Sequence, residues 1–151
     1  LRKRPMPKSN FKLKLVNYKR VNAKYKNLKY KKILKILSKL DTTKFDIALY
    51  KNKKILETGT SNLLFVKNNK IFSPNKDCYK GTTIKFFSKK VKINYTNIFL
   101  RDLINYEEIL IVGSGKGVVS ISSIEGNSWK RKSLKLFNKL VKIYKSEIKN
   151  N

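Results

Sequence analysis

A single glutamate, Glu57, is the residue of this chain best placed to do chemistry. Only 9 of the 151 residues are acidic, and Glu57 directly precedes the small polar residues Thr58 to Asn62. The chain has no histidine, which excludes Ser-His-Asp and Cys-His catalysis and almost all zinc sites. We therefore expect no metal, and a carboxylate presented by a small-residue turn at the centre of any site.

Two glycine-containing segments could contact a phosphate group. The run from Gly113 to Gly117 offers backbone N–H groups and the Ser114 hydroxyl, although it fits neither the Walker motif nor a dinucleotide fingerprint. Gly81-Thr82-Thr83 stands where a helix is expected to start, and helix starts carry unpaired N–H groups. Each segment could equally be an ordinary turn or cap. Together with Glu57 they suggest a cofactor that carries both a phosphate and a basic ring nitrogen.

The elements that would position these residues follow from the hydrophobic pattern. After Glu57, two short apolar runs flank the polar turn Lys67-Asn68-Asn69, which predicts a β-hairpin over 63–72. Further strands are predicted at 11–18, 45–50, 55–57, 91–95, 109–112 and 118–124, and helices at 28–40, 82–90, 97–103 and from 128 onward. The expected helix caps are a threonine in 81–83, Thr96 or Asn97, and Ser128. This order predicts a mixed α/β (α+β) domain.

The composition leaves one alternative function open. The net charge of +28 and the pI near 10.3 are typical of proteins that bind nucleic acid or anionic surfaces. However, the lysines are spread over every predicted element, and arginine, which reads phosphates and bases best, is scarce. The single cysteine, Cys78, excludes an internal disulfide and is expected to be a small apolar core residue. No apolar run approaches the ~20 residues that span a bilayer, so we expect no membrane partner.

The motifs around Glu57 resemble those of the class IV aminotransferases, pyridoxal-phosphate enzymes of fold type IV. The segment 57–66 is similar to their run E-G-T-x-S-N-hydrophobic-F-hydrophobic, with Thr58 inserted before the glycine. Residues 79–83 stand where the family has L-x-G-I-T-R, with Ile84 in place of its arginine. Residues 107–119 are similar to its D-E-x-F and T-G-T-A region, and 45–49 to its D-E-A-L strand. The matches follow the family's order from about residue 26 to residue 124.

The resemblance assigns roles to named residues. It implies that pyridoxal 5'-phosphate is the cofactor and that Glu57 pairs with its pyridinium nitrogen, which keeps the ring able to accept electrons from a substrate carbanion. It implies that Tyr79 packs against the ring. The implied phosphate contacts are Thr82, Thr83, Ser114 and Gly115.

The resemblance also implies a lysine that holds the cofactor and moves the substrate's α-proton. The family pattern K-[ST]-x-N-Y-L, a little over thirty residues before the glutamate, fits Lys26 best, since 57 − 26 = 31. Lys14 resembles the motif but lies 57 − 14 = 43 residues away, and Lys24 and Lys29 are weaker rivals. With Lys26 in this role, Tyr30 is expected near the ring hydroxyl.

The resemblance covers only the larger, C-terminal domain of the family. We expect residues 1–10 to be a linker and residues 11–151 to be the cofactor-binding domain, in either a fragment of a longer enzyme or a remnant without activity. Within the family the short segment between lysine and glutamate favours a 4-amino-4-deoxychorismate lyase, which gives 4-aminobenzoate and pyruvate for folate synthesis. A branched-chain or D-amino-acid aminotransferase is the close alternative, and a basic nucleic-acid-binding domain is the alternative of another class. The resemblance further implies a cytoplasmic homodimer that acts on a small amino substrate.

Overall fold

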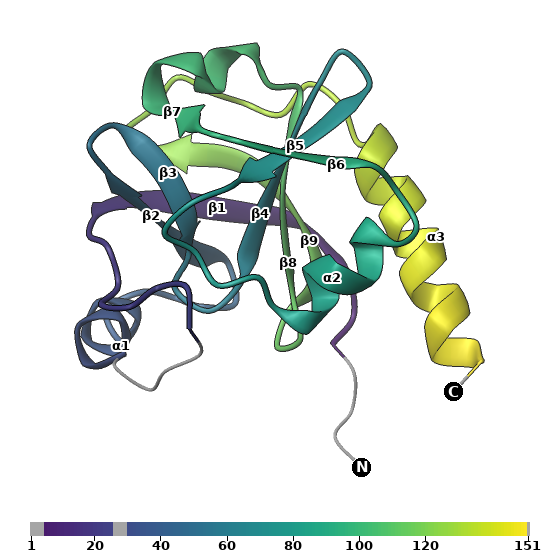
Figure 1. Cartoon of the computed structure of the whole chain (residues 1–151), viewed down its shortest axis with the longest axis horizontal. Coiled ribbons are helices and arrows are strands. Elements are labelled where there is room, and N and C mark those ends of the chain that lie inside the picture. The colour runs from purple at the N-terminus through teal and green to yellow at the C-terminus, as the bar shows by residue number, and fades with distance from the viewer. Residues whose placement is uncertain (1–4, 26–29, 151) are drawn as a thin grey trace.

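The computed structural model describes residues 5–25 and 30–150, and these form one large sheet with helices packed on it (Figure 1). The elements are β1 (Lys8–Asn17), α1 (Lys31–Leu37), β2 (Phe45–Lys51), β3 (Lys54–Thr58), β4 (Asn62–Lys67), β5 (Lys70–Pro74), α2 (Thr82–Ser88), β6 (Ile93–Thr96), β7 (Ile98–Phe99), the 3₁₀ helix η1 (Leu100–Asn105), β8 (Glu108–Gly113), β9 (Gly117–Glu125) and α3 (Lys135–Lys149). The predicted mixed α/β class is confirmed. None of the helices in these ranges is long and apolar enough to cross a membrane.

The sheet curls until its two edges meet. Its strand order is β6-β5-β4-β8-β9-β1-β2-β3-β7, so β6 and β7 are the two edge strands. Only Asn97 separates β6 from β7 in the chain, which places the two edges next to each other (Figure 1). The short connection from β3 to β4 joins strands that are far apart in this order, so residues 59–61 cross one end of the curled sheet.

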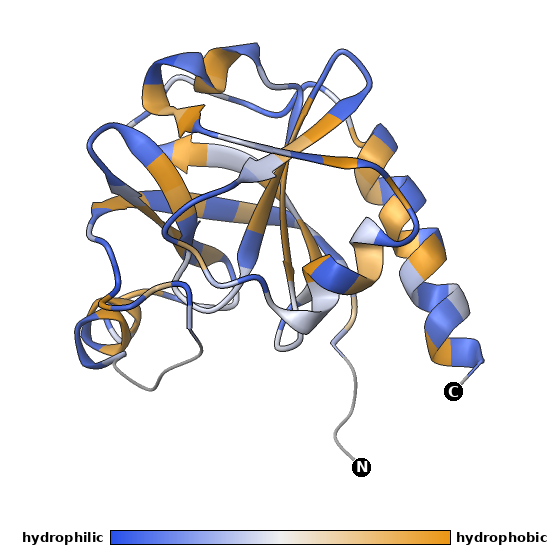
Figure 2. Cartoon of the chain, viewed as in Figure 1, coloured by the Kyte–Doolittle hydropathy of each residue, from blue (hydrophilic) through white to orange (hydrophobic). Residues whose placement is uncertain are grey.

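The core lies on both faces of the central strands. One cluster takes residues from β1, β4, β8 and β9, with the fully buried Trp129 among them, and fills the inside of the curl. The opposite face of β8 is covered by α2 and α3, which contribute Ile84, Phe87 and Leu140 (Figure 2). Strand β8 is therefore buried on both faces, which explains its unbroken apolar run at 109–112. Helix α1 packs separately through Ile33 on Ile47 and Leu49 of β2.

The predicted hairpin after Glu57 is confirmed. Strands β4 and β5 pair antiparallel, with Phe65 opposite Phe72 and Lys67 opposite Lys70. Asn68 and Asn69 both have positive φ, 51° and 60°, as a tight two-residue hairpin turn requires. Strand β1 begins at Lys8, within the span expected to be a linker.

The predicted helix caps are wrong. Helix α2 has Gly81 at its N-cap without a side-chain cap, and residues 98–105 form β7 and η1 rather than one capped helix. Helix α3 begins at Lys135, well after Ser128, because Trp129 is buried and donates its indole N–H to the Tyr106 carbonyl at 2.8 Å. That contact holds the segment before the helix in the core.

The N-terminus of α3 is capped from another element. The Glu108 carboxylate, at the start of β8, accepts the backbone N–H groups of Leu136 at 2.9 Å and Phe137 at 3.1 Å. Glu108 is 1% exposed, and burial raises its pKa while the two amides oppose the rise. A negative charge near free N–H groups at a helix start is stabilising. Sequence patterns at the helix itself cannot reveal a cap that comes from residue 108.

We expect Glu108→Ala to lower the free energy of unfolding by about 2 kcal/mol, because it leaves buried N–H groups at the start of α3 without acceptors. Urea denaturation followed by circular dichroism measures this change. Glu125→Ala, at the exposed end of β9, is the matched control and should change stability little. Equal effects of the two substitutions would show that α3 does not depend on the Glu108 cap.

Candidate active site

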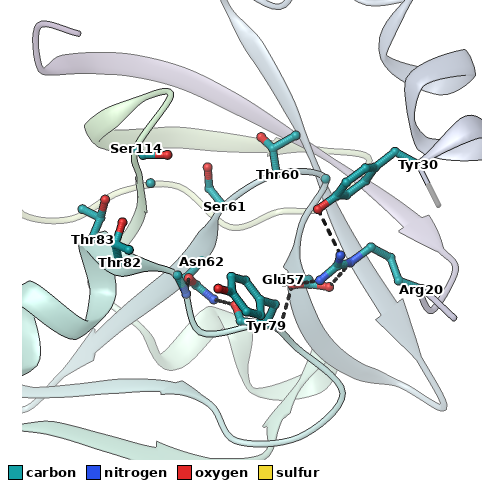
Figure 3. A pocket seen from close by; sticks show the side chains of 13 residues that line it. Arg20, Tyr30, Glu57, Thr60, Ser61, Asn62, Tyr79, Thr82, Thr83 and Ser114 are labelled. Atoms are coloured by element: carbon teal, nitrogen blue, oxygen red, sulfur yellow. Dashed lines mark hydrogen bonds and ion pairs between the residues drawn. The ribbon is translucent and has the colours of Figure 1, made fainter. Parts of the chain in front are cut away.

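The site is built around a buried ion pair between Glu57 and Arg20 (Figure 3). Glu57 lies on β3, opposite Leu49 of β2, and is 4% exposed, while Arg20 is 3% exposed. The guanidinium binds the carboxylate through two atoms, with Nε 2.6 Å from Oε1 and Nη2 3.1 Å from Oε2. Such two-point pairs are strong and fix the orientation of the carboxylate.

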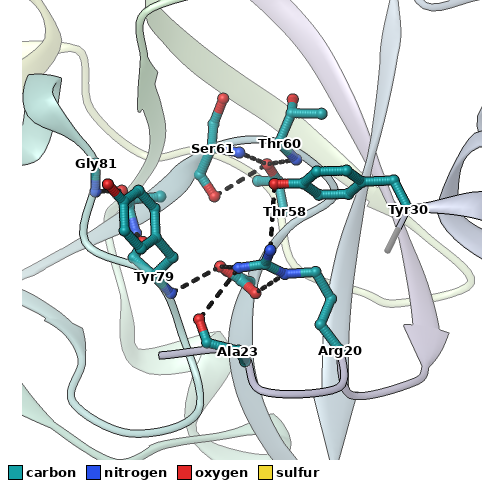
Figure 4. A network of polar contacts seen from close by, with 10 residues as sticks. Arg20, Ala23, Tyr30, Thr58, Thr60, Ser61, Tyr79 and Gly81 are labelled. Carbon is teal, nitrogen blue, oxygen red and sulfur yellow. Dashed lines mark hydrogen bonds and ion pairs between the residues drawn. The ribbon is translucent and has the colours of Figure 1, made fainter. Parts of the chain in front are cut away.

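Three further contacts complete the pair (Figure 4). Arg20 donates from Nη1 to the Tyr30 hydroxyl at 3.2 Å and from Nη2 to the Ala23 carbonyl at 3.3 Å. The backbone N–H of Tyr79 donates to Glu57 Oε2 at 3.1 Å. A carboxylate offers about four acceptor positions, and the contacts above use two on Oε2 and one on Oε1. Counting only donors from residues 5–25 and 30–150, Oε1 of Glu57 therefore has room for one more donor.

The ion pair keeps both partners charged. Burial raises the pKa of Glu57, and Arg20 and the Tyr79 amide oppose that rise. Burial would lower the pKa of Arg20, but Glu57 outweighs it and the pKa stays above its ordinary value. An arginine is not deprotonated in a protein, so a carboxylate in two-point contact with it is ionised.

A pocket opens beside this pair and has two chemically different ends (Figure 3). Arg20, Glu57 and Tyr30 stand at one end, and the hydroxyl groups of Thr82, Thr83 and Ser114 gather at the other. The remaining lining residues are Gly59, Thr60, Ser61, Asn62, Tyr79, Gly81 and Gly113. The pocket thus joins a charged carboxylate end to a hydroxyl-rich end.

The small residues after Glu57 form a tight turn that brings these ends together. The Thr58 hydroxyl accepts the N–H of Ser61 at 2.8 Å, and the Thr58 N–H donates to the Ser61 carbonyl at 3.0 Å. A Cβ on Gly59 would lie 2.9 Å from Ile33 of α1, and a Cβ on Gly113 would lie 2.3 Å from the Ser61 hydroxyl. Both glycines therefore allow close approach of neighbouring elements to the turn.

Asn62 connects the turn to the start of α2. Its side-chain amide donates to the Tyr79 carbonyl at 2.7 Å, and its Oδ1 accepts the Gly81 N–H at 3.0 Å. Since Tyr79 also binds Glu57, the segment 79–81 is held from both sides of the pocket. This arrangement places Thr82 and Thr83, the first residues of α2, on the pocket wall.

The structure brings most of the expected site residues into one pocket, namely Tyr30, Glu57, Tyr79, Thr82, Thr83 and Ser114. Gly115 follows Ser114 in the β8–β9 turn but does not line the pocket. Lys26 and its rival Lys29 lie outside the described residues. Lys14 is exposed on β1 and Lys24 is exposed in the segment after it, and neither lines the pocket. The roles of these residues stay predictions.

Sequence reasoning missed Arg20 and Asn62 as site residues. Arg20 lies 37 positions before Glu57, and no motif joined the two. Its one signal was its type, because arginine is rare in a chain that otherwise uses lysine. Cys78, next to Tyr79, is the buried core residue that was predicted, and burial raises the pKa of its thiol to about 11, which leaves it without nucleophilic character at neutral pH.

Comparison with known proteins gives the family. A model of the family described as amino-transferase class IV matches residues 2–124, which is most of the chain. The chain belongs to the class IV aminotransferases. The resemblance predicted from the motifs is thereby confirmed. The chain is also 29% identical over 73 residues to an uncharacterised protein of Haemophilus influenzae, which covers 48% of this chain and 39% of that protein.

Solved structures share the fold of this class IV aminotransferase chain. A candidate 4-amino-4-deoxychorismate lyase of Legionella pneumophila has a TM-score of 0.78 at 15% identity, over 93% of this chain and 57% of that one. A branched-chain aminotransferase of Thermoproteus uzoniensis with norvaline has 0.76 at 15% identity, over 91% and 50%. An aminotransferase of Brucella abortus bound to the cofactor PLP has 0.72 at 19% identity, over 94% and 55%. The chain spans about half the length of these structures.

We expect Arg20→Gln to lower the free energy of unfolding by about 3 kcal/mol, because it leaves Glu57 buried without its cation. Chemical denaturation of the purified protein measures the loss. The control is Arg101→Gln, since the Arg101 side chain is 77% exposed and its pair with Asp102 is loose, at 4.0 Å. A loss no larger for Arg20→Gln than for Arg101→Gln would contradict the central place of the ion pair.

Proposed function

We propose that this chain is the cofactor-binding domain of a pyridoxal-phosphate-dependent enzyme. The observation that carries the proposal is the two-ended pocket, with an ionised Glu57 at one end and three hydroxyl side chains at the other (Figure 3). Pyridoxal phosphate has complementary groups, namely a basic ring nitrogen that suits the carboxylate and a phosphate that suits the hydroxyl groups. When bound, it supplies an electron sink for a carbanion at the substrate's α-carbon.

Glu57 is proposed to bind the ring nitrogen. Among the residues that the structure describes, only Arg20 donates to its Oε1, and the acceptor position left suits a single N–H donor. Arg20 and the Tyr79 amide keep the carboxylate ionised and fixed in orientation, so that it favours the protonated ring. A carboxylate that is already oriented loses little freedom when the ligand binds.

The phosphate is proposed to bind at the opposite end of the pocket. Thr82, Thr83 and Ser114 offer hydroxyl donors there, and Gly115 offers backbone next to Ser114. The aromatic ring of Tyr79 lies between the two ends (Figure 3). Tyr30 is held near Glu57 by Arg20, which is consistent with the expected contact to the ring hydroxyl.

Lys26 is proposed as the residue that holds the cofactor and carries the substrate's α-proton. Its spacing from Glu57 and the family motif support this assignment over Lys14, whose exposed position on β1 is outside the pocket lining. A lysine amine serves as a base when its neighbours favour the neutral form.

Among the reactions of the family, we propose elimination of pyruvate from 4-amino-4-deoxychorismate. The products, 4-aminobenzoate and pyruvate, together contain all atoms of the substrate, so the reaction needs no amino acceptor. The short segment between Lys26 and Glu57 supports this choice, and the fold likeness to the Legionella protein is consistent with it. We also propose that residues 11–151 belong to the cofactor-binding domain, that the linker expected at 1–10 ends where β1 begins at Lys8, and that the chain assembles as a homodimer.

We expect the purified protein to bind pyridoxal phosphate with a visible absorbance band, and borohydride to fix the cofactor on the peptide that contains Lys26. Peptide mapping by mass spectrometry reads the label. Lys26→Ala should abolish the label, and the control Lys24→Ala should leave it. A label on another peptide would show that the lysine assignment is wrong, whereas absence of any label on the unchanged protein would refute the cofactor proposal.

We expect equal amounts of 4-aminobenzoate and pyruvate when the protein is incubated with 4-amino-4-deoxychorismate in the absence of a keto acid. Chromatography of the products measures both. The control incubation supplies a branched-chain amino acid or a D-amino acid with a keto acid acceptor. Amino transfer in the control, together with no pyruvate in the first incubation, would replace the lyase by an aminotransferase.

A further inference from the structure

A second buried ion pair involves Lys116, two residues after the pocket residue Ser114. Asp46, near the start of β2, is 1% exposed, and its Oδ1 accepts the backbone N–H of Ile47 at 2.7 Å. Its Oδ2 has no hydrogen-bond partner among the described residues. The cation beside it is the ammonium of Lys116, whose Nζ lies 3.7 Å from Oδ2. Burial raises the pKa of Asp46, and Lys116 opposes the rise.

Lys116 belongs to the turn that carries Ser114. Its side chain is only 21% exposed, and its Nζ lies 4.9 Å from the centroid of the Phe11 ring on β1. Lys116 directly precedes β9, and its partner Asp46 lies on β2. Since the strand order is β9-β1-β2, the Lys116 side chain reaches past β1. One side chain therefore ties the β8–β9 turn to a strand that is not its neighbour in the sheet.

The tip of this turn has little packing of its own. Ser114 and Gly115 are exposed, and a Cβ added to Gly115 would meet nothing within 4 Å. The turn closes through the Lys116 N–H to the Gly113 carbonyl at 3.3 Å, followed by Gly117 with φ of 71°. The paired Gly113 and Gly117 hold the two ends of the turn, and the Lys116 side chain adds a contact from the turn to β2.

Burial of a charged carboxylate costs free energy, and an apolar side chain could fill the same space. Apolar residues of similar size in place of a buried ion pair often leave stability unchanged or raise it. A pair that persists beside a ligand-binding turn is better explained by what it positions. Neither Asp46 nor Lys116 lines the pocket, so neither residue touches a ligand there.

We propose that Asp46 and Lys116 are positioning residues that hold the Ser114 turn in the geometry required to bind the phosphate group of the cofactor. This inference rests on the proposed function, since it assumes that the phosphate lies at the hydroxyl end. The inference predicts that loss of the pair weakens the binding of ligands that carry the phosphate and leaves the binding of ligands without it unchanged.

The test compares pyridoxal phosphate with pyridoxal, which lacks the phosphate. Fluorescence titration gives both dissociation constants for the unchanged protein, Lys116→Met, Lys116→Arg, and the double variant Asp46→Asn/Lys116→Met. We expect both variants without the lysine to bind pyridoxal phosphate about tenfold more weakly, a coupling of ordinary size for residues in contact, while their affinity for pyridoxal is unchanged. Lys116→Arg keeps a cation that can reach Asp46 and should restore most of the affinity.

The double variant keeps the test decisive if Lys116→Met alone fails to fold, because it removes both charges and leaves no unpaired buried charge. Lys70→Met, at an exposed position of β5, controls for the loss of one positive charge from a chain of net charge +28. The inference is overturned if the double variant keeps the full affinity for pyridoxal phosphate, or if it loses both ligands equally. An unchanged protein that binds pyridoxal phosphate no more tightly than pyridoxal would instead refute the proposed function.

Discussion

The arrangement of the site depends on the buried ion pair between Arg20 and Glu57. It joins β3 to the segment that follows β1, and through the Tyr79 amide it also fixes the approach to α2. A carboxylate buried this deeply requires a cation in contact, since an unpaired charge in the interior costs several kcal/mol, on the order of 3 to 5. Arg20 meets that requirement and at the same time holds the Tyr30 hydroxyl at the pocket. The same pair therefore joins two parts of the fold and fixes the orientation of the carboxylate beside the pocket.

The curled sheet explains why so short a turn can carry a site. Because its edges meet, the ends of β3 and β4 stand across one opening of the curl, and residues 59–61 bridge it. Two glycines permit this bridge, Gly59 against α1 and Gly113 against Ser61. Gly113, which belongs to a possible phosphate-binding run in the sequence, thus has a packing role as well. Close packing of the side chains of Ile33 on Gly59 and of Ser61 on Gly113 helps to bring the carboxylate end and the hydroxyl end into one pocket.

The sequence predicted what depends on neighbouring residues and missed what depends on distant ones. The hairpin after Glu57 followed from two apolar runs and an asparagine turn, and its pairing is confirmed. The predicted N-cap of α3, Ser128, was wrong for two reasons. The acceptor at the start of the helix is Glu108, on another element, and the burial of Trp129 makes the helix begin later in the chain. Arg20 was missed for the same reason, since its partner lies 37 residues away. Family motifs recovered Glu57 and the hydroxyl residues because they record such distant contacts indirectly.

The few buried acidic residues, rather than the many lysines, make the polar contacts that join separate elements of this structure. Three of the buried residues are acids, Asp46, Glu57 and Glu108, in a chain with only 9 acidic residues. Each binds a different element: Glu108 the start of α3, Glu57 the segment with Arg20, and Asp46 the β8–β9 turn through Lys116. Burial selects acids that have partners, because an unpaired one would lower stability. The net charge of +28 therefore comes mainly from surface residues, while the buried acids have partners where two elements meet.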